Sequence, residues 1–231
     1  MLELTEVNSF CGNSHILHNV SLAVEAGGFT AIVGRNGMGK TMLLKTIMGL
    51  TDRVRGSIAL GTHSLTSLPT HLRAKAGIGY VPQGRDIIHQ FTVKENILMG
   101  CYARSDGKKR LPELVLDLFP YLRENLNRRA GLLSGGQQQQ LAIARALAAN
   151  PNVLLLDEPT EGIQPNLVEQ IEQTIIRLNR EFGLTIVLVE QNIAFARRAS
   201  RQFVMMNNGA VAACGAVSDL SDELVHEYMA V

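Results

Sequence analysis

Residues 34–41 have the composition and spacing of a loop that binds phosphate. They match the pattern G-x-x-x-x-G-K-[ST], with an apolar strand expected before them and a helix after them. The glycines let backbone N–H groups turn toward phosphate oxygens, and the following helix adds its positive end. The lysine charge suits the β- and γ-phosphates, and the last hydroxyl suits Mg²⁺. The loop consists of Gly34, Arg35, Asn36, Gly37, Met38, Gly39, Lys40 and Thr41.

Two adjacent carboxylates, Asp157 and Glu158, follow the apolar run 153–156. Such a run is typical of a strand buried in a parallel sheet. An aspartate at its end suits a Mg²⁺ contact, usually through water, and the next glutamate suits orienting or deprotonating an attacking water. Acids are common at strand ends, so the pair alone is a weak signal. Together with the phosphate loop it predicts nucleotide hydrolysis.

Residues 133–137 form a second glycine-rich segment at an expected helix start. A serine N-cap and two exposed glycine N–H groups make it suitable for an anion. Two separate phosphate-binding surfaces on one chain indicate a dimer that encloses nucleotide, although a flexible loop capped by serine stays open as the alternative. The segment consists of Leu133, Ser134, Gly135, Gly136 and Gln137.

Strand-like and helical runs alternate along most of the chain, which predicts an α/β fold. Helices are expected after the phosphate loop and over 111–118, 137–149, 165–182 and 221–228. A polar loop is expected over 9–14, and Asn207-Asn208-Gly209 predicts a hairpin between 203–206 and 210–214. Strands are absent from about 84 to 150, which indicates an inserted helical subdomain. The other expected strands are 2–7, 21–24, 29–33, 78–81, 153–157 and 185–189.

Composition excludes several classes of protein. Lys and Arg total 22 and Asp and Glu total 21, a net charge of +1 that gives no electrostatic case for nucleic acid. The apolar runs stop far short of the roughly 20 residues that span a bilayer. Three distant cysteines, Cys11, Cys101 and Cys214, indicate neither a disulfide framework nor a metal site. The chain is therefore expected to be cytosolic and reduced.

With Gln83 after Tyr80-Val81-Pro82, these motifs occur in the order and spacing of an ABC transporter ATP-binding cassette, which the chain resembles over essentially its whole length. The resemblance implies a P-loop NTPase fold: a RecA-like core with an antiparallel β subdomain and an inserted helical subdomain. One cassette would cover 1–231. Residues 1–84 and 151–231 would form the nucleotide-binding core, and 85–150 the helical subdomain that carries the signature motif.

Within this family the chain resembles the ATP-binding subunits of branched-chain amino acid importers and their urea or short-chain amide relatives, the urea type most closely. The length, without a long C-terminal regulatory extension, fits that branch. The segments that carry the likeness are 81–85, 137–141, 160–165 and 189–191.

The resemblance also implies a role for each motif, with ATP and Mg²⁺ as ligands. Residues 34–42 and Cys11 would bind nucleotide, 133–137 would close over ATP bound by a partner cassette, and 84–92 would lie near membrane subunits. The catalytic residues would be Glu158, Lys40, Gln191 and Gln83. The metal contacts would come from Thr41, Gln83 and Asp157.

The implied partners are a second cassette, in a homo- or heterodimer, two transmembrane permease subunits and, indirectly, a periplasmic solute-binding protein. The chain would sit as a peripheral subunit on the cytoplasmic face of the inner membrane. Its expected cargo is urea or a short-chain amide, followed by a branched-chain amino acid. No nucleic acid partner is expected.

Four residues depart from the family pattern. Cys11 stands where an aromatic ring normally stacks on adenine, so either the adjacent Phe10 replaces it or base stacking is lost. Met42 replaces a second hydroxyl and removes a hydrogen bond to the α-phosphate. Gln191 replaces the switch histidine and cannot carry a proton at neutral pH, although the importer branch also has glutamine there. Gln164 replaces an aspartate, which affects signalling across the dimer.

Two other functions remain open. Cys11 and Met42 favour a nucleotide-gated cassette that hydrolyses ATP weakly and completes a partner's site, whereas intact Lys40, Asp157 and Glu158 oppose it. A soluble ABC ATPase of DNA repair or translation would usually carry coiled-coil insertions or a second cassette. This chain has room for neither.

Overall fold

The computed structural model describes residues 1–229, and its larger sheet has six strands in the order β10-β9-β3-β8-β7-β6. Strands β9 to β6 of this order are parallel, and β10 is an antiparallel edge strand. All residues of β3, β7 and β8 are buried, as their continuous apolar sequences predict. The strands are β3 (Phe29–Val33), β6 (Ile78–Val81), β7 (Val153–Asp157), β8 (Thr185–Val189), β9 (Gln202–Asn207) and β10 (Ala210–Ala216).

The smaller sheet is antiparallel, with the order β2-β1-β4-β5. It corrects the expectation of a polar loop over 9–14, because both flanking strands run through that segment and only Gly12 and Asn13 turn. Polar residues are compatible with these strands, since an antiparallel sheet can expose one face to water. The strands are β1 (Leu2–Cys11), β2 (Ser14–Val24), β4 (Arg53–Leu60) and β5 (His63–Ser64).

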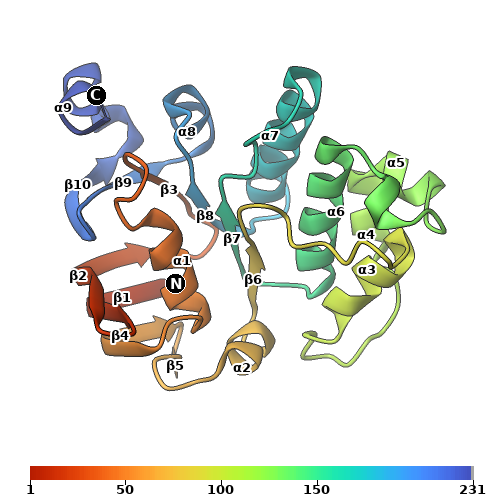
Figure 1. Cartoon of the computed structure of the whole chain (residues 1–231), viewed down its shortest axis with the longest axis horizontal. Coiled ribbons are helices and arrows are strands. Elements are labelled where there is room, and N and C mark those ends of the chain that lie inside the picture. The colour runs from red at the N-terminus through yellow and green to blue at the C-terminus, as the bar shows by residue number, and fades with distance from the viewer. Residues whose placement is uncertain (230–231) are drawn as a thin grey trace.

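Helices fill the space between and beside the sheets (Figure 1). Helix α1 (Lys40–Met48) packs between them, where Leu43, Leu44 and Ile47 share one apolar cluster with both sheets. On the opposite face of the large sheet, α7 (Pro165–Arg180) and α8 (Ile193–Ala199) contribute to a second cluster. Helix α2 (Thr70–Lys75) precedes β6, and α9 (Asp222–Met229) ends the described chain.

Residues 84–150 contain four α-helices and no named strand, as expected, and lie to one side of the sheets (Figure 1). Helices α4 and α6 fall close to the expected 111–118 and 137–149. No helix within residues 1–229 combines the length and apolar character needed to cross a bilayer. The four helices are α3 (Val93–Cys101), α4 (Glu113–Leu118), α5 (Pro120–Glu124) and α6 (Gly135–Ala148).

Candidate functional site

The phosphate loop joins the end of β3 to the start of α1, and its three glycines all have positive φ angles. These are 147° at Gly34, 80° at Gly37 and 98° at Gly39. A Cβ on Gly34 would lie 2.5 Å from the carbonyl oxygen of Met206 on β9, so the loop fits only without a side chain there. Gly39 is the N-cap of α1, whose first N–H groups are free for a ligand. The backbone geometry that phosphate binding requires is therefore present.

Lys40 holds its ammonium inside this loop. Its Nζ donates to the carbonyl oxygens of Gly34 at 2.7 Å and Arg35 at 3.0 Å, and lies 3.7 Å from Glu158 Oε1. Burial lowers the pKa of Lys40, and the neighbouring carboxylates of Glu158 and Asp157 oppose that shift. Lys40 is therefore a buried ammonium group stabilised by two nearby carboxylates, and it lies where the phosphates of a nucleotide would bind.

Asp157 lies at the carboxyl end of β7 beside Thr41, the first residue after the loop lysine. The Thr41 hydroxyl donates to Asp157 Oδ1 at 3.0 Å, and the Tyr80 hydroxyl donates to Oδ2 at 3.4 Å. Asp157 is fully buried, and this desolvation raises its pKa even though both hydrogen bonds oppose the shift. A hydroxyl and a carboxylate side by side form an oxygen donor set of the kind that Mg²⁺ prefers. The residues present therefore fit the metal.

Glu158 turns back toward the loop with a φ angle of 45°. Its Oε1 accepts a hydrogen bond from Gln191 Nε2 at 2.9 Å, and its Oε2 accepts one from Gln83 Nε2 at 3.4 Å. The same Gln83 nitrogen donates to Glu161 at 2.8 Å. The two glutamines follow β6 and β8, whose carboxyl ends flank that of β7 in the sheet. All four predicted catalytic side chains are therefore brought to one place.

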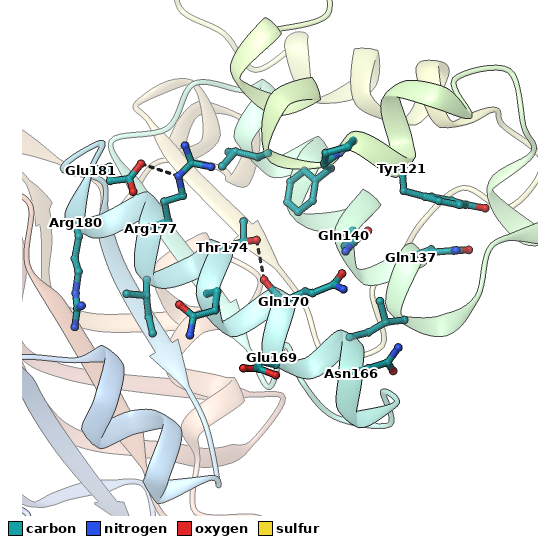
Figure 2. A pocket seen from close by; sticks show the side chains of 16 residues that line it. Tyr121, Gln137, Gln140, Asn166, Glu169, Gln170, Thr174, Arg177, Arg180 and Glu181 are labelled. Atoms are coloured by element: carbon teal, nitrogen blue, oxygen red, sulfur yellow. Dashed lines mark hydrogen bonds and ion pairs between the residues drawn. The ribbon is translucent and has the colours of Figure 1, made fainter.

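A pocket of about 290 Å³ opens among these groups. Gln83 and Met42 line it with the loop, whereas Asp157 lies deeper and Cys11 does not line it. A larger cavity, about 930 Å³, lies between α6 and α7 (Figure 2). It shares only Gln137 with the predicted site. The lining residues of the smaller pocket are Ile16, Asn36, Gly37, Gly39, Lys40, Thr41, Met42, Gln83 and Glu158.

Phe10, one of the two alternatives considered for the missing aromatic ring at Cys11, already stacks on other side chains. Its ring stacks on His15 with the centroids 4.4 Å apart, and the Arg53 guanidinium lies 4.1 Å from its centroid. His15 on β2 and Arg53 on β4 pair with Phe10 from opposite sides of β1. The Phe10 ring is thus covered by its own sheet and is not available to a base in this arrangement.

The segment 133–137 begins α6 with a capping box, as its sequence indicates. Gln137 N donates to Ser134 Oγ at 3.4 Å, and Ser134 N donates to Gln137 Oε1 at 2.9 Å. A Cβ on Gly136 would lie 2.4 Å from the Leu167 side chain, so α6 and α7 approach closely there. None of these five residues lines the phosphate pocket, and the segment forms a separate surface.

Sequence reasoning missed Glu190, which follows β8 and is buried. It accepts hydrogen bonds from the Thr160 hydroxyl at 2.6 Å and from the N–H groups of Gln191 and Asn192. Burial raises the pKa of Glu190, and these hydrogen bonds oppose the shift. The signal that identified Asp157 was present here too, because Glu190 is an acid directly after an apolar strand. The carboxylate fastens the Gln191 loop to the turn after Glu158.

The arrangement of loop, carboxylates and glutamines corresponds to one family. A family model described as ABC transporter matches residues 17–161, more than half of the chain. The chain belongs to the ABC transporter family. This ABC cassette is an ATPase, with ATP and Mg²⁺ as its ligands, and its P-loop NTPase fold is confirmed by solved relatives.

Two relatives of this ABC cassette share about two fifths of its residues. A probable branched-chain amino acid transport ATP-binding protein, LivF, of Archaeoglobus fulgidus is 40% identical over 98% of this chain and 95% of that protein. A high-affinity branched-chain amino acid transport ATP-binding protein, BraG, of Pseudomonas aeruginosa is 39% identical over 91% of each.

Among solved structures, a dimeric ATP-binding cassette in a post-hydrolysis state bound to ADP and Pi has a TM-score of 0.81 to this ABC cassette. It is 29% identical, and the match covers 94% of this chain and 99% of that one. A cassette in an ADP conformation has the same TM-score at 28% identity, over 98% of this chain and 97% of that one.

Proposed function

We propose that this chain is the ATP-hydrolysing subunit of an ABC importer for a small polar solute. The observation that carries the proposal is that Lys40, Glu158 and Gln83 line one pocket. Gln191 is hydrogen-bonded to Glu158, and Asp157 lies beside Thr41. Phosphoryl transfer depends mainly on positioning and charge stabilisation, and this set supplies both.

Each residue has one task in this proposal. The loop amides and Lys40 hold the β- and γ-phosphates, while Thr41, Asp157 and Gln83 hold Mg²⁺, which neutralises phosphate charge when bound. Glu158 orients the attacking water, because its carboxylate lies 3.7 Å from the lysine ammonium, at the phosphate end of the pocket. Gln191 and Gln83 already donate to that carboxylate and fix its direction.

A head-to-tail dimer follows from the two separate surfaces. Residues 133–137 lie outside the chain's own pocket, and a relative solved as a dimer supports closure of this segment over a partner's ATP. In this proposal 1–84 and 151–231 form the nucleotide-binding core. Residues 85–150 form the helical subdomain that presents the signature segment.

A further cleft supports docking of permease subunits at the cytoplasmic face of a membrane. It has a volume of about 350 Å³ and lies between α2, β6, α3 and the end of α6. Leu50 and Met99 line this cleft and are 50% and 44% exposed. Leu72 on α2 and Tyr102 after α3 are also exposed. Apolar groups around a cleft are typical of a protein interaction site.

The cargo is proposed from likeness alone, since no part of this site contacts a transported solute. The names of the relatives at 40% and 39% identity favour a branched-chain amino acid. The motifs at 81–85 and 189–191 favour urea or a short-chain amide. Uptake measurements with both kinds of solute separate the two.

A weakly hydrolysing cassette that completes a partner's site is the second candidate. It is favoured by the engaged ring of Phe10 and by Met42, which lines the pocket without a hydroxyl. Single-turnover hydrolysis by the isolated chain separates the candidates, because a weak cassette would retain bound ATP over many minutes.

The direct test of the proposed site is the Glu158→Gln variant. We expect its hydrolysis rate to fall by at least about 100-fold, the usual range for losing a general base, while a fluorescent ATP analogue binds as in the parent chain. Gln170→Ala, an exposed change on α7, serves as the matched control and should hydrolyse ATP normally. Hydrolysis by Glu158→Gln at the parent rate, with nucleotide bound, would refute the assignment.

A further inference from the structure

The three residues after Gln83 have an unusual backbone. Gly84, Arg85 and Asp86 have φ angles of 84°, 75° and 47°, all in the left-handed region. For Arg85 and Asp86 this conformation costs free energy and persists only where surrounding contacts enforce it. Such a segment is stiff, so a displacement of Gln83 is passed on to the residues that follow.

The contacts that enforce this backbone come from α6. Arg145 donates from Nη1 to the Asp86 carbonyl at 2.8 Å and from Nη2 to the Arg85 carbonyl at 3.3 Å. Arg145 is half-buried, and this burial lowers its pKa. The segment after Gln83 is therefore fastened to the helix that begins with the signature residues.

The Arg85 side chain reaches the first turn of that helix. Its Nη1 donates to Gln138 Oε1 at 3.4 Å, and a Cβ on Gly135 would lie 3.2 Å from both terminal nitrogens. On the other side, a Cβ on Gly162 would lie 4.0 Å from Nη2. Gly162 directly follows Glu161, which accepts the Gln83 hydrogen bond. Arg85 thus lies between the start of α6 and the turn after Glu158.

We propose that Arg85 is a positioning residue that couples the chain's own ATP pocket to the segment 133–138, which would contact the partner's ATP. When Gln83 moves from Glu161 toward a γ-phosphate in the chain's own pocket, Arg85 moves with it and fixes residues 133–138 in place for the partner's ATP. The planar guanidinium suits this role, because its fork can contact the helix start and the turn together. The inference rests on the proposed function of the pocket and of the signature segment.

Hydrogen exchange of the full chain, read by mass spectrometry, tests the coupling. The probes are Mg²⁺ with ADP and Mg²⁺ with the non-hydrolysable ATP analogue AMP-PNP. The protein is kept dilute enough for light scattering to show a monomer, so protection of 133–138 cannot come from a partner. In the parent chain both nucleotides should slow exchange at 34–41, and only AMP-PNP should slow it at 133–138, by about tenfold.

The Arg85→Ala variant should keep the protection of 34–41 and lose the AMP-PNP-dependent protection of 133–138. Arg85→Lys, which keeps the charge without the planar fork, should recover only part of it. Arg129→Ala is the matched control, because within residues 1–229 the Arg129 side chain makes no hydrogen bond or ion pair, and it should behave as the parent.

Two results would overturn the coupling while leaving the proposed function intact. One is protection of 34–41 alone in the parent chain. The other is that the extra protection of 133–138 by AMP-PNP over ADP survives in Arg85→Ala. If that variant lowers protection equally with both nucleotides and leaves the difference unchanged, Arg85 has only a structural role. A parent chain with no protection at 34–41 would refute the proposed function itself, and the inference with it.

Discussion

Asp157 carries its carboxylate where water does not reach, beside the Thr41 and Tyr80 hydroxyls. The carboxylate is therefore costly to keep ionised in the chain without metal, which is what its raised pKa expresses. A cation that binds there offsets this cost. The residues that make the site suited to Mg²⁺ thus also weaken the fold when no metal is bound.

Asp157→Asn should raise the melting temperature of the metal-free chain at pH 7 to 8. For a chain of this size each kcal/mol corresponds to about 2–4 °C. Because its pKa is raised in the folded state, protonation of Asp157 stabilises the fold of the parent chain, and ionised Asp157 does not. The advantage of the variant should therefore shrink as the pH falls through that raised pKa toward the ordinary value of about 3.9. A parent chain that melts above the variant at pH 8 without Mg²⁺ would contradict this.

Gln191 donates to Glu158 and does not titrate, so this position should give the rate of ATP hydrolysis no pH dependence near neutrality. In Gln191→His the rate of ATP hydrolysis should change as the pH passes through about 6.5, the ordinary pKa of histidine. Lys40, Glu158 and Glu190 surround the position in both proteins, so the ratio of the two rates isolates residue 191. A ratio that stays constant from pH 6 to 8 would contradict the prediction.

Phe10 is covered by His15 and Arg53, so the pocket should hold nucleotide mainly through its triphosphate. We expect ATP and GTP to bind with dissociation constants within about fivefold of each other. Cys11→Tyr should tighten ATP binding, since base stacking contributes about 1–3 kcal/mol, and Phe10→Ala should leave it nearly unchanged. Strong preference for ATP in the parent chain, lost in Phe10→Ala, would show that the Phe10 ring opens to the base.

At the scale of elements, the apolar strands could be predicted because burial dictates their sequence. Strands β3, β6, β7 and β8 have the expected bounds, and their carboxyl ends carry the predicted site residues. Strand β4 was missed, since it begins Arg53-Val54-Arg55-Gly56-Ser57 and its longer partner, β1, lies far away in the sequence. Helix α3 was missed although Thr92 and Glu95 form a capping box, a signal that the sequence does contain.

The contacts between elements had no sequence signal at all. The stack on Phe10 depends on the register of three strands, and the contact of Arg85 with Gln138 depends on how α6 meets the segment after β6. Spacing along the chain indicates which residues could do chemistry. Tertiary packing decides which of them touch.

Arg73 holds the end of α1 and the segment before α2 together. Its guanidinium is buried and donates to the carbonyls of Thr46 and Ile47 at the end of α1, and to those of Leu68 and Thr66 before α2. Arg73→Ala should lower the free energy of unfolding by about 3–5 kcal/mol, because it leaves buried acceptors without donors. Chemical denaturation measures this, with the exposed Arg128→Ala as control. A loss below about 1 kcal/mol would contradict the account.

At the scale of the whole molecule, the near-neutral charge now has a physical meaning. In the proposed function, affinity for phosphate is local to the loop 34–41 and the segment 133–137, so it would not change the net charge of +1. Two exposed apolar side chains, Leu50 and Met99, line the cleft between α2 and α3, which is the surface proposed for membrane subunits.

The most direct test of the central claim is solute uptake into proteoliposomes that contain this chain with the membrane subunits that copurify with it. We predict ATP-dependent uptake of a labelled branched-chain amino acid or of urea, abolished by Glu158→Gln and retained by Gln170→Ala. Uptake that continues at the parent rate with Glu158→Gln, or purification of the chain without any membrane subunit, would contradict the claim that this cassette powers import.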